Sequence, residues 1–337
     1  MRNQPDGGEG ILEAIRNLDV DYVMSSPGSE WGPVWEALTR QQVEGRDGPT
    51  YIHCWHETLA VDLAIGYTAV TGKMQVVILH AGAGLLQGAM GVHAAQLSDT
   101  PMVVMSGESL SYGDDPDFDP GRQWFTSLSI VGGPQRLFEP IVKWANQATS
   151  PATLYEQVVR AGEMAQRRPA GPTYLNVPIE VMLDDWTPPA KLRKAPPAPI
   201  QRPTDGDIER VADLLRGAKN PVITTESAGA TLEGYNALLD LAELGSIPVV
   251  EGMVALCGNF PKEHPLHQGY GMPPALQEAD LVLVVQNRVP WYPPSACPTD
   301  AKIVVIDNDP HKGHMVYQSL QADAYLEGDV AETLRLL

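Results

Sequence analysis

Short runs of apolar, largely β-branched residues recur along the chain and restrict its fold more than any other feature. In the first half these runs are Tyr22–Met24, Met74–Leu79 and Pro101–Met105, and such runs are typical of strands buried on both faces. The segments His56–Val70 and Gly84–Gln96 lie between them and place apolar and small residues at helical spacing. This alternation of strands and helices predicts an open α/β sheet with mostly parallel strands.

The same alternation returns in the second half of the chain. The expected strands there are Pro221–Thr225, Ile247–Val250, Leu281–Val285 and Lys302–Asp307, with a helix from about Leu232 to Leu244. We therefore expect a second α/β unit with a Rossmann-like shape.

A proline-rich segment, residues 186–203, separates the two halves. It reads WTPPAKLRKAPPAPIQRP, with six prolines and no apolar periodicity, which is typical of a stiff, extended connector. A length of 337 residues also fits two domains of roughly 150 residues each. The expected organisation is a first domain over 1–185, a linker over 186–203 and a second domain over 204–337.

Composition excludes several classes of protein. With 42 acidic and 23 basic residues the net charge is −19, which argues against nucleic-acid binding because phosphate affinity depends on clustered Lys and Arg. No run approaches the ~20 apolar residues of a membrane span, and the start MRNQPDGGEG lacks the apolar core of a signal peptide. Three widely spaced cysteines, Cys54, Cys257 and Cys297, disfavour a disulfide framework. We expect a cytoplasmic protein.

The most conspicuous local pattern is VVILHAGAGLLQGAMG, in which a buried strand runs into Gly82, Gly84 and Gly88 and then a helix. It fits a dinucleotide-binding turn, where glycines let a pyrophosphate approach a helix N-terminus. However, some 75 residues precede it, whereas that fingerprint normally follows the first strand of its domain and has an acid about 20 residues on. Asp99 and Glu108 straddle that position. The alternative is a tight strand-to-helix turn that needs glycines for packing.

Two polar groups stand beside predicted elements, residues 26–30 (SPGSE) after the first strand and residues 53–57 (HCWHE) at the start of a helix. Glu57 could simply stabilise the helix dipole. Trp55 and the apolar helix that follows instead suggest that Glu57 points toward a packed region, where a carboxyl is costly unless hydrogen-bonded or protonated. His80 ends a buried strand at the edge where open α/β sheets bind ligands, a position that equally suits a core histidine.

Together these segments resemble the thiamine-diphosphate-dependent decarboxylases and carboligases, such as acetolactate synthase and benzoylformate decarboxylase. The resemblance covers nearly the whole chain. It is carried by SSPGSEWGPVWEAL, WHETLAVDLAIGYTAVTGK, LHAGAGLLQGAMG, LSDTPMVVMSGE, GPTYLNVPIEV, HPLHQGYG, ADLVLVV, IVVIDNDP and YLEGD. It implies that residues 1–185 form the domain that holds the aminopyrimidine ring of the cofactor, and that residues 204–337 form the family's middle domain.

The resemblance also implies a role for Glu57. This residue matches the family glutamate that hydrogen-bonds the pyrimidine ring nitrogen. A carboxyl held near-neutral in an apolar site can exchange a proton with that nitrogen and favour the imino tautomer. The imine then removes the thiazolium proton, and the resulting ylid adds to a ketone carbonyl and stores electrons after bond cleavage.

Further site residues follow from the same likeness. Ser29, His80 and Gln87 match an active-site Ser, His and Asn of benzoylformate decarboxylase, and acetolactate synthases usually lack the histidine, which favours a decarboxylase-like or lyase-like pocket. His264 matches another histidine of that enzyme, although HPL is common in the family and a structural role is the alternative. The expected catalytic residues are Glu57, His80, Ser29 and His264, and the expected cofactor-binding residues are Pro27, Gly28, Glu57 and Gln87, with no metal ligand.

One family feature is missing from the sequence. The family's third domain binds the diphosphate through Mg²⁺ with a Gly-Asp-Gly motif and a later Asn, and the segments Asp205–Asp207 and Gly328–Asp329 do not provide it. We therefore expect one subunit of a split enzyme whose partner carries the diphosphate and Mg²⁺ site, with two such pairs assembled, or else a protein that has lost catalysis.

The expected substrate is a 2-oxo acid or a 2-hydroxy ketone. Two alternatives remain open, a non-decarboxylating 2-hydroxy ketone or 2-hydroxyacyl-CoA lyase subunit, and a non-catalytic regulatory protein that binds a nucleotide in its Rossmann-like half. The middle domain of the family binds FAD, an ADP-containing ligand or neither, and the sequence does not decide among these.

Overall fold

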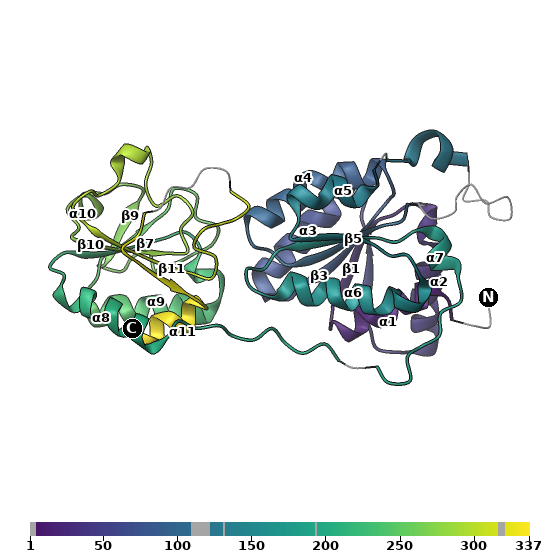
Figure 1. Cartoon of the computed structure of the whole chain (residues 1–337), viewed down its shortest axis with the longest axis horizontal. Helices are drawn as coiled ribbons and strands as arrows, with labels where there is room; N and C mark the ends of the chain where they lie inside the picture. Colours follow the sequence, from purple (N-terminus) through teal and green to yellow (C-terminus); the bar gives the residue numbers. More distant parts are fainter. Residues whose placement is uncertain (1–4, 109–121, 131, 193, 316–320) are drawn as a thin grey trace. The chain divides into compact units, whose positions relative to one another are not determined.

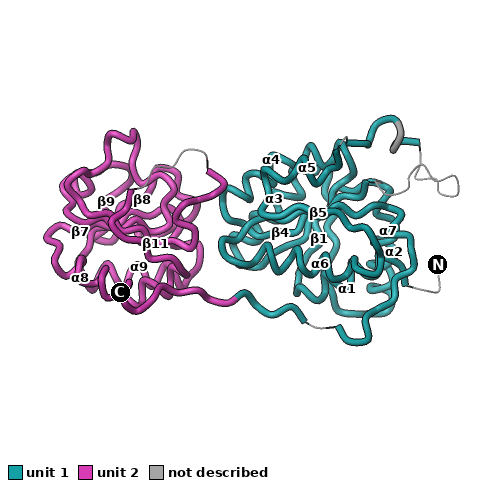
Figure 2. The backbone as a smooth tube through the Cα atoms, in the orientation of Figure 1, with its two compact units in different colours: residues 1–198 teal, residues 199–337 magenta. Residues whose placement is uncertain are grey.

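The chain folds into two compact units. The computed structural model describes residues 5–108, 122–130, 132–192, 194–315 and 321–337. Unit 1 comprises residues 1–198 and unit 2 residues 199–337 (Figure 2). The division falls inside the proline-rich segment 186–203, of which Arg193 lies outside the described residues, as do the first four residues of the chain.

The described part of unit 1 contains a sheet of six parallel strands in the order β2-β1-β3-β4-β6-β5 (Figure 1). The strands are β1 (Tyr22–Ser26), β2 (Thr50–His53), β3 (Gln75–Leu79), β4 (Met102–Ser106), β5 (Trp144–Gln147) and β6 (Pro172–Asn176). The central strands β3, β4 and β6 are buried along their whole length. The predicted open parallel α/β sheet is confirmed.

Helices cover both faces of this sheet (Figure 1). The helices of unit 1 are α1 (Gly7–Asn17), α2 (Gly32–Glu44), α3 (Glu57–Thr71), α4 (Ala83–Leu97), α5 (Pro134–Phe138), α6 (Pro151–Gln166) and α7 (Ile179–Leu183), with helical turns η1 (Ser29–Trp31), η2 (Trp124–Leu128) and η3 (Glu139–Ile141). One core lies between the sheet and α1, α2, α6 and α7, and a second lies between the sheet and α3, α4 and α5.

Alternate residues of a strand enter these two cores. On β3, Val76 and Ile78 pack in the core of α1 and α6, while Val77 and Leu79 pack in the core of α3 and α4. Successive side chains of a strand point to opposite faces, so a strand covered on both faces must be apolar throughout.

Unit 2 repeats this architecture with its own cores. Its described residues form a parallel sheet of six strands in the order β12-β11-β10-β7-β8-β9. The strands are β7 (Pro221–Thr225), β8 (Val249–Glu251), β9 (His267–Tyr270), β10 (Leu281–Val285), β11 (Lys302–Asp307) and β12 (Ala324–Glu327). The helices are α8 (Asp205–Gly217), α9 (Leu232–Gly245), α10 (Pro274–Gln277) and α11 (Val330–Leu336), with turns η4 (Ala228–Ala230) and η5 (Pro294–Ala296). The core against α8, α9 and α11 is separate from the core against α10.

No helix in the described ranges of the chain combines the length and the apolar character needed to cross a membrane.

Candidate active site

The candidate site lies where the chain changes direction across the sheet of unit 1. β2 adjoins one side of β1, and β3 with the strands that follow adjoins the other. Open α/β sheets bind ligands at the carboxyl ends of two strands related in this way. Residues 26–30 leave β1 at this point, and His80 directly follows β3.

Hydrogen bonds tie the segment after β1 to β3. The backbone N–H of His80 donates to the Ser26 carbonyl at 3.0 Å, and the indole Nε1 of Trp31 donates to the Leu79 carbonyl at 2.9 Å. Trp31 is fully buried. Because both ends of this short segment are bonded to the same strand, Ser29 and Glu30 have a fixed path beside His80.

Glu30 and His80 form an ion pair at this edge. The imidazole Nδ1 lies 3.0 Å from Oε1 and 3.1 Å from Oε2 of Glu30, and the Ala81 N–H donates to Oε1 at 2.8 Å. The Glu30 side chain is 3% exposed and the His80 side chain 28%. The hydrogen bond that the imidazole donates to Glu30 raises the pKa of His80, while burial lowers it, with a net increase. Glu30 was not among the residues expected from the sequence.

Gly28 leaves the space that this pair occupies. A Cβ at residue 28 would lie 1.9 Å from Nδ1 of His80 and 2.1 Å from Oε2 of Glu30. Any larger residue would therefore separate the imidazole from the carboxylate. This contact, rather than backbone strain, requires glycine here, because the φ angle of Gly28 is −96°.

Glu57 lies in the first turn of α3, close to the start of α4. His56 caps α3 by accepting a hydrogen bond from the Thr58 N–H at 3.2 Å. A Cβ at Gly84 would lie 2.8 Å from Oε1 of Glu57 and 2.7 Å from the Cβ of His80. The side chains of Glu57 and His80 therefore both lie close to the backbone of Gly84.

The surroundings of Glu57 differ from the sequence-based expectation. Glu57 is half-buried, but Trp55 is 91% exposed, and Leu59 and Leu63 of α3 are also exposed. The sequence suggested that Glu57 points toward a packed region, and the exposed Trp55 does not contribute to such packing. An aromatic residue at a helix start does not by itself imply burial, because large apolar side chains also occupy protein surfaces.

The glycines of the segment after β3 are required by the backbone conformation and by close packing. Gly82 has a φ of +57°, in the left-handed region that glycine adopts without strain, and a Cβ at Gly88 would lie 2.5 Å from Cδ1 of Leu79. These features match the tight strand-to-helix turn that the sequence left open as an alternative to a dinucleotide-binding turn.

A second buried carboxyl, Glu108, lies just beyond the carboxyl end of β4. Its Oε1 accepts a hydrogen bond from the Gly82 N–H at 2.8 Å, and its Oε2 accepts one from the Ser106 hydroxyl at 2.6 Å. Ser106 also contacts the Tyr174 hydroxyl at 2.6 Å. Burial raises the pKa of Glu108. The sequence signal for this residue is an acid two positions after a buried strand.

Three other expected site residues have weaker ties to this group. Ser29 and Gln87 are exposed, and Pro27 is half-buried. No hydrogen bond among the described residues joins the side chain of Ser29 or Gln87 to Glu57 or His80, although the Gln87 carbonyl accepts from the Thr58 hydroxyl at 2.9 Å. The expected contacts of these three residues with the cofactor remain predictions.

His264 belongs to unit 2. Its Nε2 lies 3.2 Å from Oε1 of Glu243, and its Nδ1 accepts a hydrogen bond from the Leu266 N–H at 3.2 Å. Its ring meets Phe260 edge to face at 5.2 Å between centroids. Both nitrogens thus serve contacts within unit 2, and these contacts are those of the structural role left open for His264.

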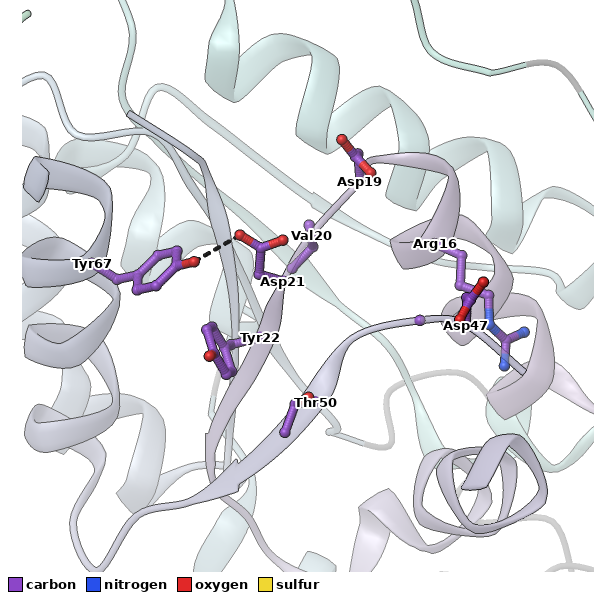
Figure 3. A pocket seen from close by; sticks show the side chains of 9 residues that line it. Arg16, Asp19, Val20, Asp21, Tyr22, Asp47, Thr50 and Tyr67 are labelled. Atoms are coloured by element: carbon purple, nitrogen blue, oxygen red, sulfur yellow. Dashed lines mark hydrogen bonds between the residues drawn. The ribbon is translucent and has the colours of Figure 1, made fainter. Parts of the chain in front are cut away.

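A cavity of about 460 Å³ lies at the opposite end of the strands (Figure 3). It is lined by residues that begin β1 and β2, including Tyr22 and Thr50, and by Asp21, whose carboxylate accepts a hydrogen bond from the Tyr67 hydroxyl at 2.8 Å (Figure 3). It is therefore not part of the group around His80, which lies at the carboxyl ends.

The corresponding edge of unit 2 is filled by its own ion pairs. Three buried carboxylates end or follow strands there, and each is bonded to a cation: Glu226 to Arg288, Glu251 to Lys262 and His267, and Asp307 to Lys312. A bound pyrophosphate would meet these carboxylates, and the cations that could neutralise it already serve them. These residues do not fit FAD or an ADP-containing ligand.

The chain is thus a protein of two parallel α/β domains, with an acid and a histidine paired at the carboxyl edge of the first sheet. The chain belongs to the thiamine pyrophosphate enzyme family. Residues 5–130 match the family's N-terminal TPP binding domain, and residues 208–337 match its central domain. Together these matches span more than half of the chain, and the resemblance seen in the sequence is confirmed.

The relatives agree with this assignment. The acetolactate synthase large subunit of Corynebacterium glutamicum is 28% identical over 347 residues, covering 98% of this chain and 52% of the relative. The sulfoacetaldehyde acetyltransferase of Roseovarius nubinhibens is 27% identical over 325 residues, covering 90% and 49%. Benzoylformate decarboxylase from Polynucleobacter necessarius shares the fold, with a TM-score of 0.81 at 22% identity over 100% of this chain and 61% of that chain. The chain spans about half the length of the curated relatives it matches.

The residues of unit 1 fit the pyrimidine half of thiamine diphosphate. Gly84 has no side chain beside the Glu57 carboxyl, and a Cβ there would stand 2.8 Å from Oε1, so the carboxyl can be approached by a flat ring. For the diphosphate and its metal, the described residues contain no group of three or more His, Cys, Asp or Glu arranged to hold an ion.

Proposed function

We propose that this chain supplies the pyrimidine-binding and central domains of a thiamine-diphosphate enzyme that cleaves or forms a carbon–carbon bond next to a carbonyl. The observation that carries the proposal is the convergence of Glu57 and His80 on Gly84 at the carboxyl edge of unit 1. The substrate class is a 2-oxo acid or a 2-hydroxy ketone.

Each residue of this edge has a defined task in the proposal. When bound, thiamine diphosphate supplies the carbon nucleophile and the electron sink. Glu57 would exchange a proton with the pyrimidine ring, as a general acid–base group within hydrogen-bond reach. His80 would hold a proton at Nε2 for the reacting carbonyl or orient a substrate carboxylate, because its Nδ1 is occupied by Glu30.

We further propose that a second polypeptide supplies the diphosphate and Mg²⁺ site. The matched segments are the N-terminal and central domains only, and the curated relatives are about twice as long as the aligned region. The net charge of −19 would repel a diphosphate unless Mg²⁺ and a binding domain neutralised it. By family likeness, two such pairs would assemble, in the cytoplasm.

Calorimetry and mixing test this arrangement. Titration of the purified chain with thiamine diphosphate and Mg²⁺ should give weak or no binding. Turnover of a 2-oxo acid should appear only after a polypeptide with the Gly-Asp-Gly and Asn motif, isolated by co-purification from the native host, is added. Micromolar affinity together with turnover by the single chain would refute the two-polypeptide arrangement.

The non-catalytic alternative is tested by mass spectrometry of ligands released from the purified protein. A nucleotide released in stoichiometric amount would favour a regulatory role for unit 2. The ion pairs at the carboxyl edge of unit 2 argue against this role, because Lys262, Arg288 and Lys312, the cations described there, already pair with buried carboxylates.

A further inference from the structure

We propose that Glu30 is the positioning residue of His80, which fixes the imidazole through Nδ1 and thereby assigns Nε2 as the nitrogen that meets substrate. This inference deepens the proposed function and depends on it for the meaning of Nε2, but the Glu30–His80 pair itself is a property of the folded chain.

The Glu30 carboxylate is held against His80 by several hydrogen bonds. Both oxygens of Glu30 lie within 3.1 Å of Nδ1 of His80, and Oε1 also accepts a hydrogen bond from the Ala81 N–H at 2.8 Å. A buried carboxylate is costly unless it is paired and hydrogen-bonded, and Glu30 has both kinds of partner. Among the described residues, no hydrogen bond is made by Nε2 of His80.

Two glycines from different loops enclose the pair. A Cβ at Gly107 would lie 2.7 Å from Cγ of Glu30, and a Cβ at Gly28 would lie 2.1 Å from its Oε2. Neither glycine has a φ in the left-handed region, so space and not backbone conformation explains them. The carboxylate therefore has one available position, directly against the imidazole.

The charges around His80 favour a protonated ring. Glu30 contributes most, and Glu57 and Glu108 add smaller effects in the same direction, while burial opposes them. All three carboxyls reach His80 from different segments, after β1, at the start of α3 and after β4. An imidazolium with Nδ1–H bonded to Glu30 must carry its second proton at Nε2.

Nuclear magnetic resonance of the purified chain labelled with ¹⁵N-histidine tests this directly, because no cofactor or partner is needed. We expect His80 to titrate above its ordinary value of 6.5, with its resonance assigned by loss in a His80→Asn variant. In Glu30→Gln, which retains an acceptor for Ala81, the pKa of His80 should fall by about one pH unit or more. The matched control is Glu36→Gln, at an exposed glutamate of α2, which should leave it unchanged.

A second pair of variants tests the contact between Glu30 and His80 without removing a charge. Gly28→Ala should lower the pKa of His80 because its Cβ would displace the imidazole from Glu30. Gly32→Ala is the control, since a Cβ there meets nothing within 4 Å. Circular dichroism and thermal unfolding would verify that each variant is folded.

The outcomes are decisive in each case. If His80 keeps its pKa in folded Glu30→Gln or Gly28→Ala, the proposal is overturned, and the same holds if the unmodified chain shows His80 titrating at or below 6.5. In the assembled enzyme, Glu30→Gln should lower kcat by about tenfold with KM nearly constant. If the resonance moves as expected but the assembly that contains the unmodified chain has no activity, the proposed function fails while the positioning of His80 stands.

Discussion

The carboxyl edges of the two sheets resemble each other in topology and differ in charge balance. In unit 2, each buried carboxylate has a cationic partner, as Asp307 has Lys312 at 3.0 Å. In unit 1, Glu30 and Glu108 are equally buried, yet their described partners are one imidazole, backbone N–H groups and a hydroxyl. No lysine or arginine is paired with either in the described residues.

This difference separates a structural edge from a reactive one. Fully matched ion pairs fix loops, because each buried charge is already compensated by its partner. Carboxyls without permanent cations can be tuned by burial, as the raised pKa of Glu108 shows, and groups with displaced pKa values are typical of functional sites. The comparison therefore supports the proposal that the chemistry takes place in unit 1.

The largest effect is expected at Glu57. Glu57→Gln retains the shape of the side chain and removes the exchangeable proton, so turnover of the assembled enzyme should fall by roughly 10²- to 10⁴-fold. Assembly, measured by size-exclusion chromatography, should be unchanged. Full activity in this variant would remove Glu57 from the mechanism.

His80→Ala should reduce kcat of the assembled enzyme by about 10²-fold while cofactor affinity changes little. The reason is that, in the proposed function, His80 would act on the reacting carbonyl, whereas Glu57 would hold the cofactor ring. Calorimetry and steady-state kinetics would measure the two quantities separately. A collapse of cofactor affinity with an unchanged rate per bound cofactor would make His80 a structural residue. The carboxyl edge of unit 1 would then be structural, as we propose for that of unit 2.

The edge of unit 2 should respond in stability. Arg288→Met leaves Glu226 buried without its partner, which should cost about 3 kcal/mol in the free energy of unfolding of unit 2. The double variant with Glu226→Gln should recover most of this loss. Lys302→Met is the control, because the exposed pair of Lys302 with Asp323 should contribute less than about 1 kcal/mol. Equal losses in Arg288→Met and Lys302→Met would contradict the structural assignment of this edge.

The smallest effect concerns Lys143, whose ammonium donates to the Arg167 carbonyl and is paired with no carboxylate among the residues that the structure describes. Burial and the nearby Arg167 lower the pKa of Lys143 to about 8, from 10.5 for an unperturbed lysine. The unfolded chain thus binds more protons between these two values, so stability should rise with pH across this window.

Urea denaturation at pH 7.5 and pH 10.5 measures this contribution. Relative to Lys143→Met, the unmodified chain should gain about 1–2 kcal/mol over that interval, after allowance for partial exposure. Tyrosine and cysteine titrations cancel in the difference. A lack of change would mean that Lys143 is compensated as Lys262 is, where burial is outweighed by the hydrogen bond and charge of Glu251 together with Tyr270, and the pKa is raised.

Of the three central strands of unit 1 that are buried along their whole length, β3 and β4 were predicted because their composition depends on burial, whereas β6 (PTYLN), which includes threonine and asparagine, was missed. β3 and β4 are buried on both faces, and each begins and ends within one residue of its predicted range. The strands β2 (TYIH) and β5 (WANQ) were missed because they lie at the two edges of the sheet and mix polar with apolar residues. Edge strands need less apolar surface, so they give a weaker signal.

The site was predictable only in part. A buried strand that ends in His80, and a glutamate at a helix start, indicated two of its members from position alone. Glu30 could not be found in this way, because its burial results from the pairing of β1 with β3 and from space left by Gly28. Both are properties of the assembled sheet and have no local sequence signature.

The hydrogen bond from the His80 amide to Ser26 also has a consequence for the timescale of motion. This bond extends the ladder between β1 and β3 by one step beyond the end of the strand. Its proton can exchange with solvent only when the centre of the sheet opens, and such amides exchange at rates governed by global unfolding. On the timescale of turnover, the backbone of His80 is therefore expected to move with the sheet, while its ring is held at Nδ1 by Glu30.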